Sequence, residues 1–73
     1  MKRLATFESP TGMIAVAKSE ALIVEKATES ERESHSKDMP FPTESPLTRI
    51  TLKSKQQRWV FGDVEEVVRE LED

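Results

Sequence analysis

The chain has 73 residues, which is room for one small domain, and about a third of them are charged. It contains no cysteine, which excludes disulfide bridges, thiolate metal sites and a thiol nucleophile, and fits a reducing compartment such as the cytoplasm. The net charge of −3 is unevenly distributed, because residues 47–61 contain four bases and no acid, whereas residues 62–73 contain one base and six acids. The longest apolar runs, Met13–Ala17 and Ala21–Val24, are too short to span a membrane or to form a signal peptide. We therefore expect a cytoplasmic protein with no membrane segment.

The N-terminal part, residues 1–27, predicts three strands. Lys2–Glu8 tolerates extended structure, and Ser9–Gly12 offers a proline and a glycine that favour a turn before the apolar run Met13–Ala17. The β-branched residues in Ala21–Glu25 favour a third strand. A helix capped by Ser19 is the alternative for that third segment.

Residues 28–46 are rich in serine, proline and charge, and such a segment buries too little apolar surface to offset its ordering entropy. We expect a flexible insertion without regular structure between two ordered halves. Met39 and Phe41 form its one apolar spot, beside Pro40 and Pro42. This spot is either incidental linker sequence or a short docking motif, since proline holds the backbone extended and lowers the entropy lost on binding.

Residues 47–61 predict a second hairpin, because Leu47–Lys53 alternates between apolar and polar and Arg58–Phe61 returns after a polar turn. We expect an apolar inner face that contains Ile50, Leu52, Trp59 and Phe61. The opposite face would then gather the basic side chains Arg49, Lys53 and Arg58, with Lys55 in the turn.

The last element is an amphipathic helix. Gly62 ends the strand and Asp63 is a suitable N-cap, with Glu66 three residues later as in a capping box. The apolar residues then follow at helical spacing: Val64, Val67, Val68 and Leu71. The whole chain is thus expected to be one α+β domain, a small antiparallel sheet of two hairpin-type halves with one C-terminal amphipathic helix. Residues 47–73 supply the second hairpin and this helix.

Four stretches together resemble the FlbD family of small flagellar-associated proteins, and many short bacterial and phage proteins: Gly12–Val16, Leu22–Glu25, Arg49–Lys53, and Val60 with Val64–Val68. The chain departs from that pattern in its insertion and at Lys55-Gln56-Gln57, where a glycine is usual. The resemblance implies the fold and a flagellar accessory role, and it carries over no catalytic residue. In kind, without a motif, a tiny acidic cysteine-free chain resembles phage-encoded regulators of host machinery, among them inhibitors of bacterial RNA polymerase.

The residues offer little for catalysis. His35 is the only histidine, and it falls in the segment that we expect to lack a rigid frame. The C-terminal acids lack the loop glycine and alternating oxygen ligands of a calcium site, and Gly12 and Gly62 are too far apart to cradle a phosphate. We therefore expect no enzyme, no cofactor and no metal.

The expected function is non-enzymatic regulation through a large protein partner, with phage-type action on bacterial RNA polymerase as the first expectation. The expected partner-binding residues are Glu65, Glu66, Glu70, Glu72, Met39 and Phe41. The alternative is a small nucleic-acid-binding module that uses the basic hairpin residues Arg49, Lys53, Lys55 and Arg58, with Trp59 as a stacking platform if it is exposed. A flagellar accessory role is the third.

Overall fold

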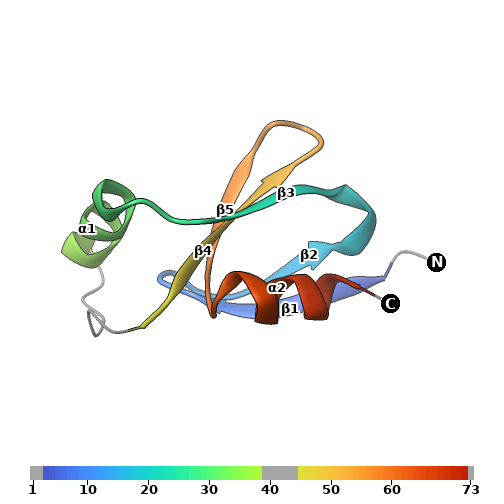
Figure 1. Ribbon diagram of the computed structural model, residues 1–73, viewed down its shortest axis with the longest axis horizontal. Coiled ribbons are helices and arrows are strands. Elements are labelled where there is room, and N and C mark those ends of the chain that lie inside the picture. Colours follow the sequence, from blue (N-terminus) through green and yellow to red (C-terminus); the bar gives the residue numbers. More distant parts are fainter. Residues whose placement is uncertain (1–2, 39–44, 73) are drawn as a thin grey trace.

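The computed structural model of the chain describes residues 3–38 and 45–72. These form two antiparallel sheets and two α-helices, which confirms the expected α+β class and adds one helix to it (Figure 1). The elements are, in chain order, β1 (Leu4–Ser9), β2 (Gly12–Ala17), β3 (Ala21–Lys26), α1 (Glu29–Asp38), β4 (Leu47–Leu52), β5 (Gln57–Phe61) and α2 (Val64–Leu71). Neither helix has the length and apolarity needed to cross a bilayer, as far as the described residues go.

Strands β1 and β2 form the expected first hairpin, with Leu4 opposite Ala17 and Ser9 opposite Gly12. Its tight loop is closed by the Ser9 hydroxyl, which donates to the carbonyl oxygen of Gly12 at 2.6 Å. Gly12 has a φ of +118°, a conformation that an L side chain rarely adopts, so glycine is needed to start β2. The inward face of β1 carries Ala5 and Phe7, both buried.

The third segment is a strand, as favoured from its β-branched residues, and the helical alternative is wrong. A short 3₁₀ turn, Lys18–Glu20, reverses the chain before β3. Strand β3 then pairs antiparallel with β4, with Val24 opposite Ile50 and a register shift between Ala21 and Ile23.

The second hairpin forms where expected, but β5 presents its opposite face to the core. Arg49 lies opposite Trp59, Ile50 opposite Arg58 and Thr48 opposite Val60, so Ile50 shares its face with Val60 and not with Trp59. The predicted inner face of Ile50, Leu52, Trp59 and Phe61 is therefore wrong. The reason is the register, because a slip of one residue moves a whole strand to its other face. The register follows from the turn, in which the Leu52 amide donates to Gln56 O and the Lys55 amide donates to Leu52 O, each at 2.8 Å.

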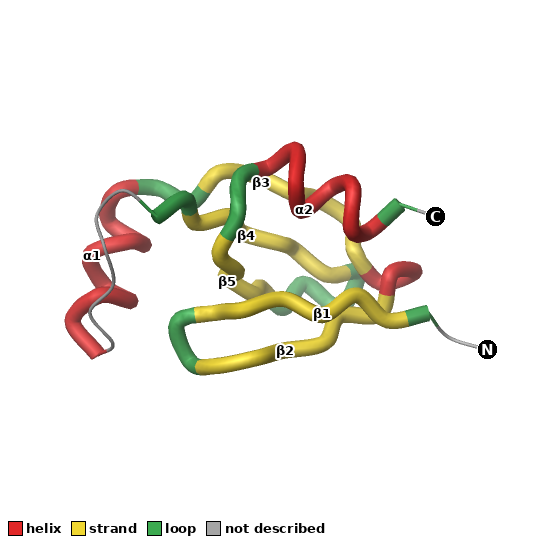
Figure 2. Tube along the Cα trace, turned by 90° about the horizontal axis from the view of Figure 1, so that it is seen from below, coloured by secondary structure: helices red, strands yellow, loops and turns green. Residues whose placement is uncertain are grey.

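The core lies between the three-stranded sheet on one side and the first hairpin and α2 on the other. Helix α2 packs beside β3, and β1 packs beside β5, which encloses the inner face of the sheet (Figure 2). The buried cluster combines residues of all these elements: Ala5, Phe7, Val16, Ile50, Val60 and Val67. Ile50 and Val60 are 0% exposed, so they replace the expected tryptophan as the centre of the hairpin's packing.

Helix α1 contradicts the expectation of an irregular segment over residues 28–46. Thr28 and Glu31 form a capping box in which the Glu31 amide donates to Thr28 Oγ1 at 3.2 Å and the Thr28 amide donates to Glu31 Oε1 at 2.8 Å. Acidic residues in the first turn and His35 and Lys37 in the last turn also suit the helix dipole. Composition averaged over the segment hides these local signals. Met39 and Phe41 lie outside the described residues.

Candidate functional site

The predicted acidic partner-binding residues gather on one exposed surface of α2. Val67 is 1% exposed and packs in the core. The other three residues of the predicted stripe are half-buried: Val64, Val68 and Leu71. The carboxylates point away from this stripe and are exposed: Glu65, Glu66, Glu70 and Glu72. These four residues are named here the acidic surface.

Two halves of the acidic surface differ in what they do for the helix. Asp63 caps α2, since its Oδ1 accepts from the Glu66 amide at 2.8 Å, and Glu65 and Glu66 in the first turn favour the helix dipole. Glu70 and Glu72 lie at the other end, where negative charge opposes the dipole. Within residues 3–38 and 45–72, none of the four carboxylates forms an ion pair or accepts a hydrogen bond.

The predicted basic face does not form. Arg49 points to the outer face of the sheet, whereas Arg58 lies opposite Ile50 and therefore belongs to the other face. Lys53 and Lys55 lie in the β4–β5 turn, and both are exposed. The expectation that Arg49, Lys53 and Arg58 share one face is wrong, because it depended on the same register as the predicted inner face.

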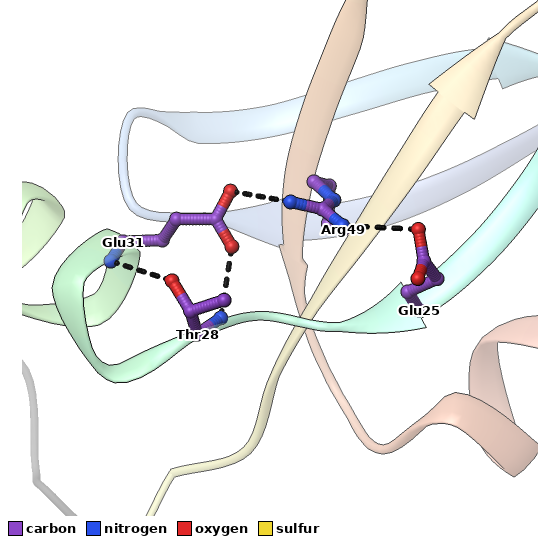
Figure 3. A network of polar contacts seen from close by, with 4 residues as sticks. All are labelled: Glu25, Thr28, Glu31 and Arg49. Atoms are coloured by element: carbon purple, nitrogen blue, oxygen red, sulfur yellow. Dashed lines mark hydrogen bonds and ion pairs between the residues drawn. The ribbon is translucent and has the colours of Figure 1, made fainter.

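Arg49 is instead the centre of an ion-pair network on the outer face of the sheet (Figure 3). Its Nη2 lies 2.9 Å from Glu25 Oε1 on β3, and its Nη1 lies 2.9 Å from Glu31 Oε2 on α1. The Arg49 side chain is 21% exposed and that of Glu31 is 20% exposed, while Glu25 is half in solvent at 52%. Arg49 thus joins three elements, and its charge is compensated within the chain.

The network shifts the ionisation of its members. Hydrogen bonds to Glu25 and Glu31 raise the pKa of Arg49 above its usual value. Burial acts to raise the pKa of Glu31, but the Thr28 amide and the Arg49 guanidinium together outweigh burial and leave the pKa of Glu31 lowered. Both groups are therefore held in their charged forms.

Trp59 lies beside Arg49 on this outer face and is half-buried beneath α1. The rings of Trp59 and His35 have their centroids 4.7 Å apart and are tilted by 48°, a normal geometry for two aromatic rings. His35, which falls in the segment that was expected to lack a rigid frame, is thus part of the contact between α1 and the sheet. A pocket of about 160 Å³ adjoins this contact, and Pro10, Ile14 and Arg58 are among the residues that line it.

A larger open groove of about 460 Å³ lies where β3 ends, β4 begins and α2 begins. Its lining is mixed: Lys26, Pro46, Leu47, Thr48, Asp63, Val64 and Glu65. Asp63, one of the two acidic residues in this lining, caps α2 through its Oδ1 atom. No group of three or more His, Asp or Glu side chains suited to a metal ion occurs in the described part of the chain.

Among the described residues, four large apolar side chains that the sequence did not single out are exposed: Leu4 (60%), Met13 (67%), Leu22 (61%) and Ile23 (46%). Leu4 and Met13 share the outward face of the first hairpin through its register, and Leu22 and Ile23 follow the irregular start of β3. Strict alternation along β1 is the signal that places Leu4 outside, since Ala5 and Phe7 point inward. Isolated exposed apolar residues are common on small domains and do not define a site.

No protein-family model matches this chain, and comparisons with curated proteins and with solved structures gave no significant match.

Proposed function

We propose that the chain is a non-enzymatic, cytoplasmic regulatory protein that binds a large protein partner through the acidic surface of α2. The observation that carries this proposal is the state of Glu70 and Glu72, which are exposed at the helix end where negative charge is unfavourable. Arg69 in the last turn and Lys18, whose Nζ donates to the Glu72 carbonyl oxygen at 3.4 Å, supply positive charge at this end, but the carboxylates of Glu70 and Glu72 form no ion pair within the described residues. Binding to a basic surface on a partner supplies the reason for carboxylates there.

The mechanism is electrostatic complementarity on a fixed helix. Val67 anchors α2 in the core, so the acidic surface is presented in one orientation and loses little conformational entropy on binding. Complementary charge mainly accelerates association and weakens with salt. The partner proposed first is bacterial RNA polymerase, on the resemblance in kind to phage-encoded regulators.

The test reverses the negative charge at the C-terminal end of α2, because positive charge is favourable there. Glu70→Lys with Glu72→Lys places cations near the C-terminus of α2, where they suit the dipole, so the variant keeps its fold. The matched control is Glu8→Lys with Glu33→Lys, which has the same net charge but changes exposed acids on β1 and α1.

Association of each variant with purified bacterial RNA polymerase is followed at low and high salt, with a lysate pull-down after nuclease treatment to recover other proteins. We expect the α2 variant to associate at least about tenfold more slowly at low salt, and the control much less so. Equal effects of both variants would show that only net charge matters and would reject the acidic surface. Binding of the unaltered chain that disappears with nuclease would favour the nucleic-acid alternative.

A further inference from the structure

Helix α1 is seated on the outer face of the second hairpin by two side chains that match a pair on the sheet. Glu31 and His35 are four residues apart and so share one face of α1. Arg49 and Trp59 are directly opposite each other on β4 and β5, which places their side chains next to each other. Glu31 forms an ion pair with Arg49, and the His35 ring packs against the Trp59 ring. Two residues one helical turn apart thus contact two residues that face each other on neighbouring strands.

The rest of α1 buries no described side chain against the sheet. None of the side chains described in residues 29–37 is buried, and the helix is polar along its whole length. Apart from Glu31 and His35, Arg32 contributes a hydrogen bond from Nη1 to the Ser45 carbonyl oxygen. Both tube and ribbon views show α1 at one end of the molecule, outside the layers that enclose the core (Figures 1 and 2). Such a helix can leave the sheet without disturbing the core.

Helix α1 leaves two hydrogen-bond donors on the sheet surface beneath it without acceptors. Within the described residues, Arg49 Nε and Trp59 Nε1 are buried and have no hydrogen-bond partner. Both atoms are donors, and an unmet buried donor is costly. A segment that offered carboxylate or carbonyl oxygens to these two atoms, as well as the two contacts of α1, would fit this surface better than α1 does.

We propose that Arg49 and Trp59 form a docking site for an acidic helical segment of a protein partner, and that α1 occupies this site in the free chain. The chemistry of the occupant follows from α1, which shows that a carboxylate fits Arg49 and that a ring four residues later fits Trp59. A nucleic acid fits less well, because Glu25 stays beside Arg49 when α1 leaves and the chain carries a net charge of −3. The site is separate from the acidic surface of α2. It binds an acidic segment, whereas the acidic surface is proposed to bind a basic one.

The partner segment competes with α1 for the same two residues. The apparent affinity of such a site is its intrinsic affinity reduced by the fraction of molecules in which it is open. Substitutions that loosen α1 without changing Arg49 or Trp59 should therefore strengthen binding. This sign distinguishes a site that α1 covers from a site that α1 helps to form.

The test compares the full chain with the variant Glu31→Gln plus His35→Ala, which removes both contacts. Glu29→Gln plus Ser34→Ala is the matched control, since it makes the same change in net charge and both residues lie on α1 and are exposed. The probe is a synthetic peptide with the sequence of residues 28–38 and blocked ends, and a second peptide carries the same two substitutions at positions 31 and 35. Trp59 is the only tryptophan, so its fluorescence reports occupation of the site.

We expect the loosened variant to bind the first peptide at least about tenfold more tightly than the full chain or the control variant does, and to bind the second peptide poorly. Adding Arg49→Gln to the loosened variant should remove the gain. The single change Glu31→Gln gives the same direction of effect if the double variant proves unstable by circular dichroism. Equal or undetectable peptide binding by all variants would overturn the proposal. Binding of a single-stranded oligonucleotide in place of the peptide would overturn it in favour of nucleic acid.

Discussion

Arg49 shows how one side chain can change role between sequence and structure. Read along the chain, it is one of four bases in an acid-free stretch. In the fold it is 21% exposed and lies between Glu25 and Glu31, each at 2.9 Å. A guanidinium that already holds two carboxylates offers little charge to a phosphate, which weakens the nucleic-acid alternative.

The lowered pKa of Glu31 predicts an acid-sensitive contribution to stability. The folded state favours the ionised carboxylate, so the contribution is complete above the ordinary value of 4.5 and is lost as the pH falls through the lowered folded value. Urea unfolding of the chain and of Glu31→Gln between about pH 7 and about pH 3 should show a difference that shrinks toward acid. Glu33→Gln is the control on the same helix. A difference that is constant with pH would contradict the ionised pairing.

Lys55 is the described non-glycine residue with a positive φ, at +73°. It lies in the β4–β5 turn. An L side chain in this region costs roughly 1–2 kcal/mol, whereas glycine adopts it freely but loses more backbone entropy on folding.

We therefore expect Lys55→Gly to raise the free energy of unfolding by about 0.5–1 kcal/mol, measured by chemical denaturation. Ser54→Gly, in the same turn but without a positive φ, should lower it. A loss of stability in Lys55→Gly would mean that the turn does not depend on this backbone strain.

At the scale of elements, the second hairpin shows that alternation defines two faces of a strand but not which face is buried. The alternation of β5 allows either of two faces to be buried, one with Trp59 and Phe61 and the other with Val60. The pairing with β4 decides between them and places Val60 in the core with Ile50. The larger aromatic surface of Trp59 is then covered by α1.

This arrangement predicts the relative costs of two truncations. Ile50→Ala leaves a cavity in the fully buried cluster and should cost about 2–5 kcal/mol, which is comparable to the whole stability of so small a domain. Trp59→Ala should cost less, because Trp59 is half-buried and touches α1 from outside the core. Thermal unfolding of both variants gives the order. A greater loss for Trp59→Ala would support the register expected from sequence.

At the scale of the whole molecule, the two helices have different relations to the core. Val67 of α2 belongs to the buried cluster, whereas α1 is attached through polar and aromatic side chains outside it. Local unfolding occurs most readily where few apolar contacts are buried. The described part of the chain is therefore a packed β-rich core with one helix that belongs to the core and one helix that is attached outside it.

Amide hydrogen exchange should separate these two helices. We expect amides within α1 to exchange at least about tenfold faster than those of β4, with α2 closer to β4. Glu31→Gln should accelerate exchange in α1 and leave β4 unchanged. Equal protection of α1 and β4 would show that α1 opens only with the whole domain, against the docking proposal.

Local chemistry explains which predictions succeeded. The first hairpin follows from Pro10 and Gly12, and α2 follows from its apolar stripe and the Asp63 cap, all of which act within a few residues. The acidic surface could be predicted for the same reason, since helical spacing alone orients its carboxylates. Helix α1 was missed although Thr28 and Glu31 carry its capping signal, because average composition outweighed a four-residue motif.

The sequence by itself determined the α+β class, the two hairpins and the C-terminal helix, because periodicity and turn residues act between near neighbours. It favoured a strand for the third segment but left a helix open. Only the tertiary structure decided that Val60 and not Trp59 enters the core, since that choice depends on pairing between strands and on the turn at Lys55. It also brought Glu25, Glu31 and Arg49 together from three elements, and His35 onto Trp59. Arg49 is 18 positions from Glu31 and 24 positions from Glu25, and no local pattern in the chain encodes contacts over such separations.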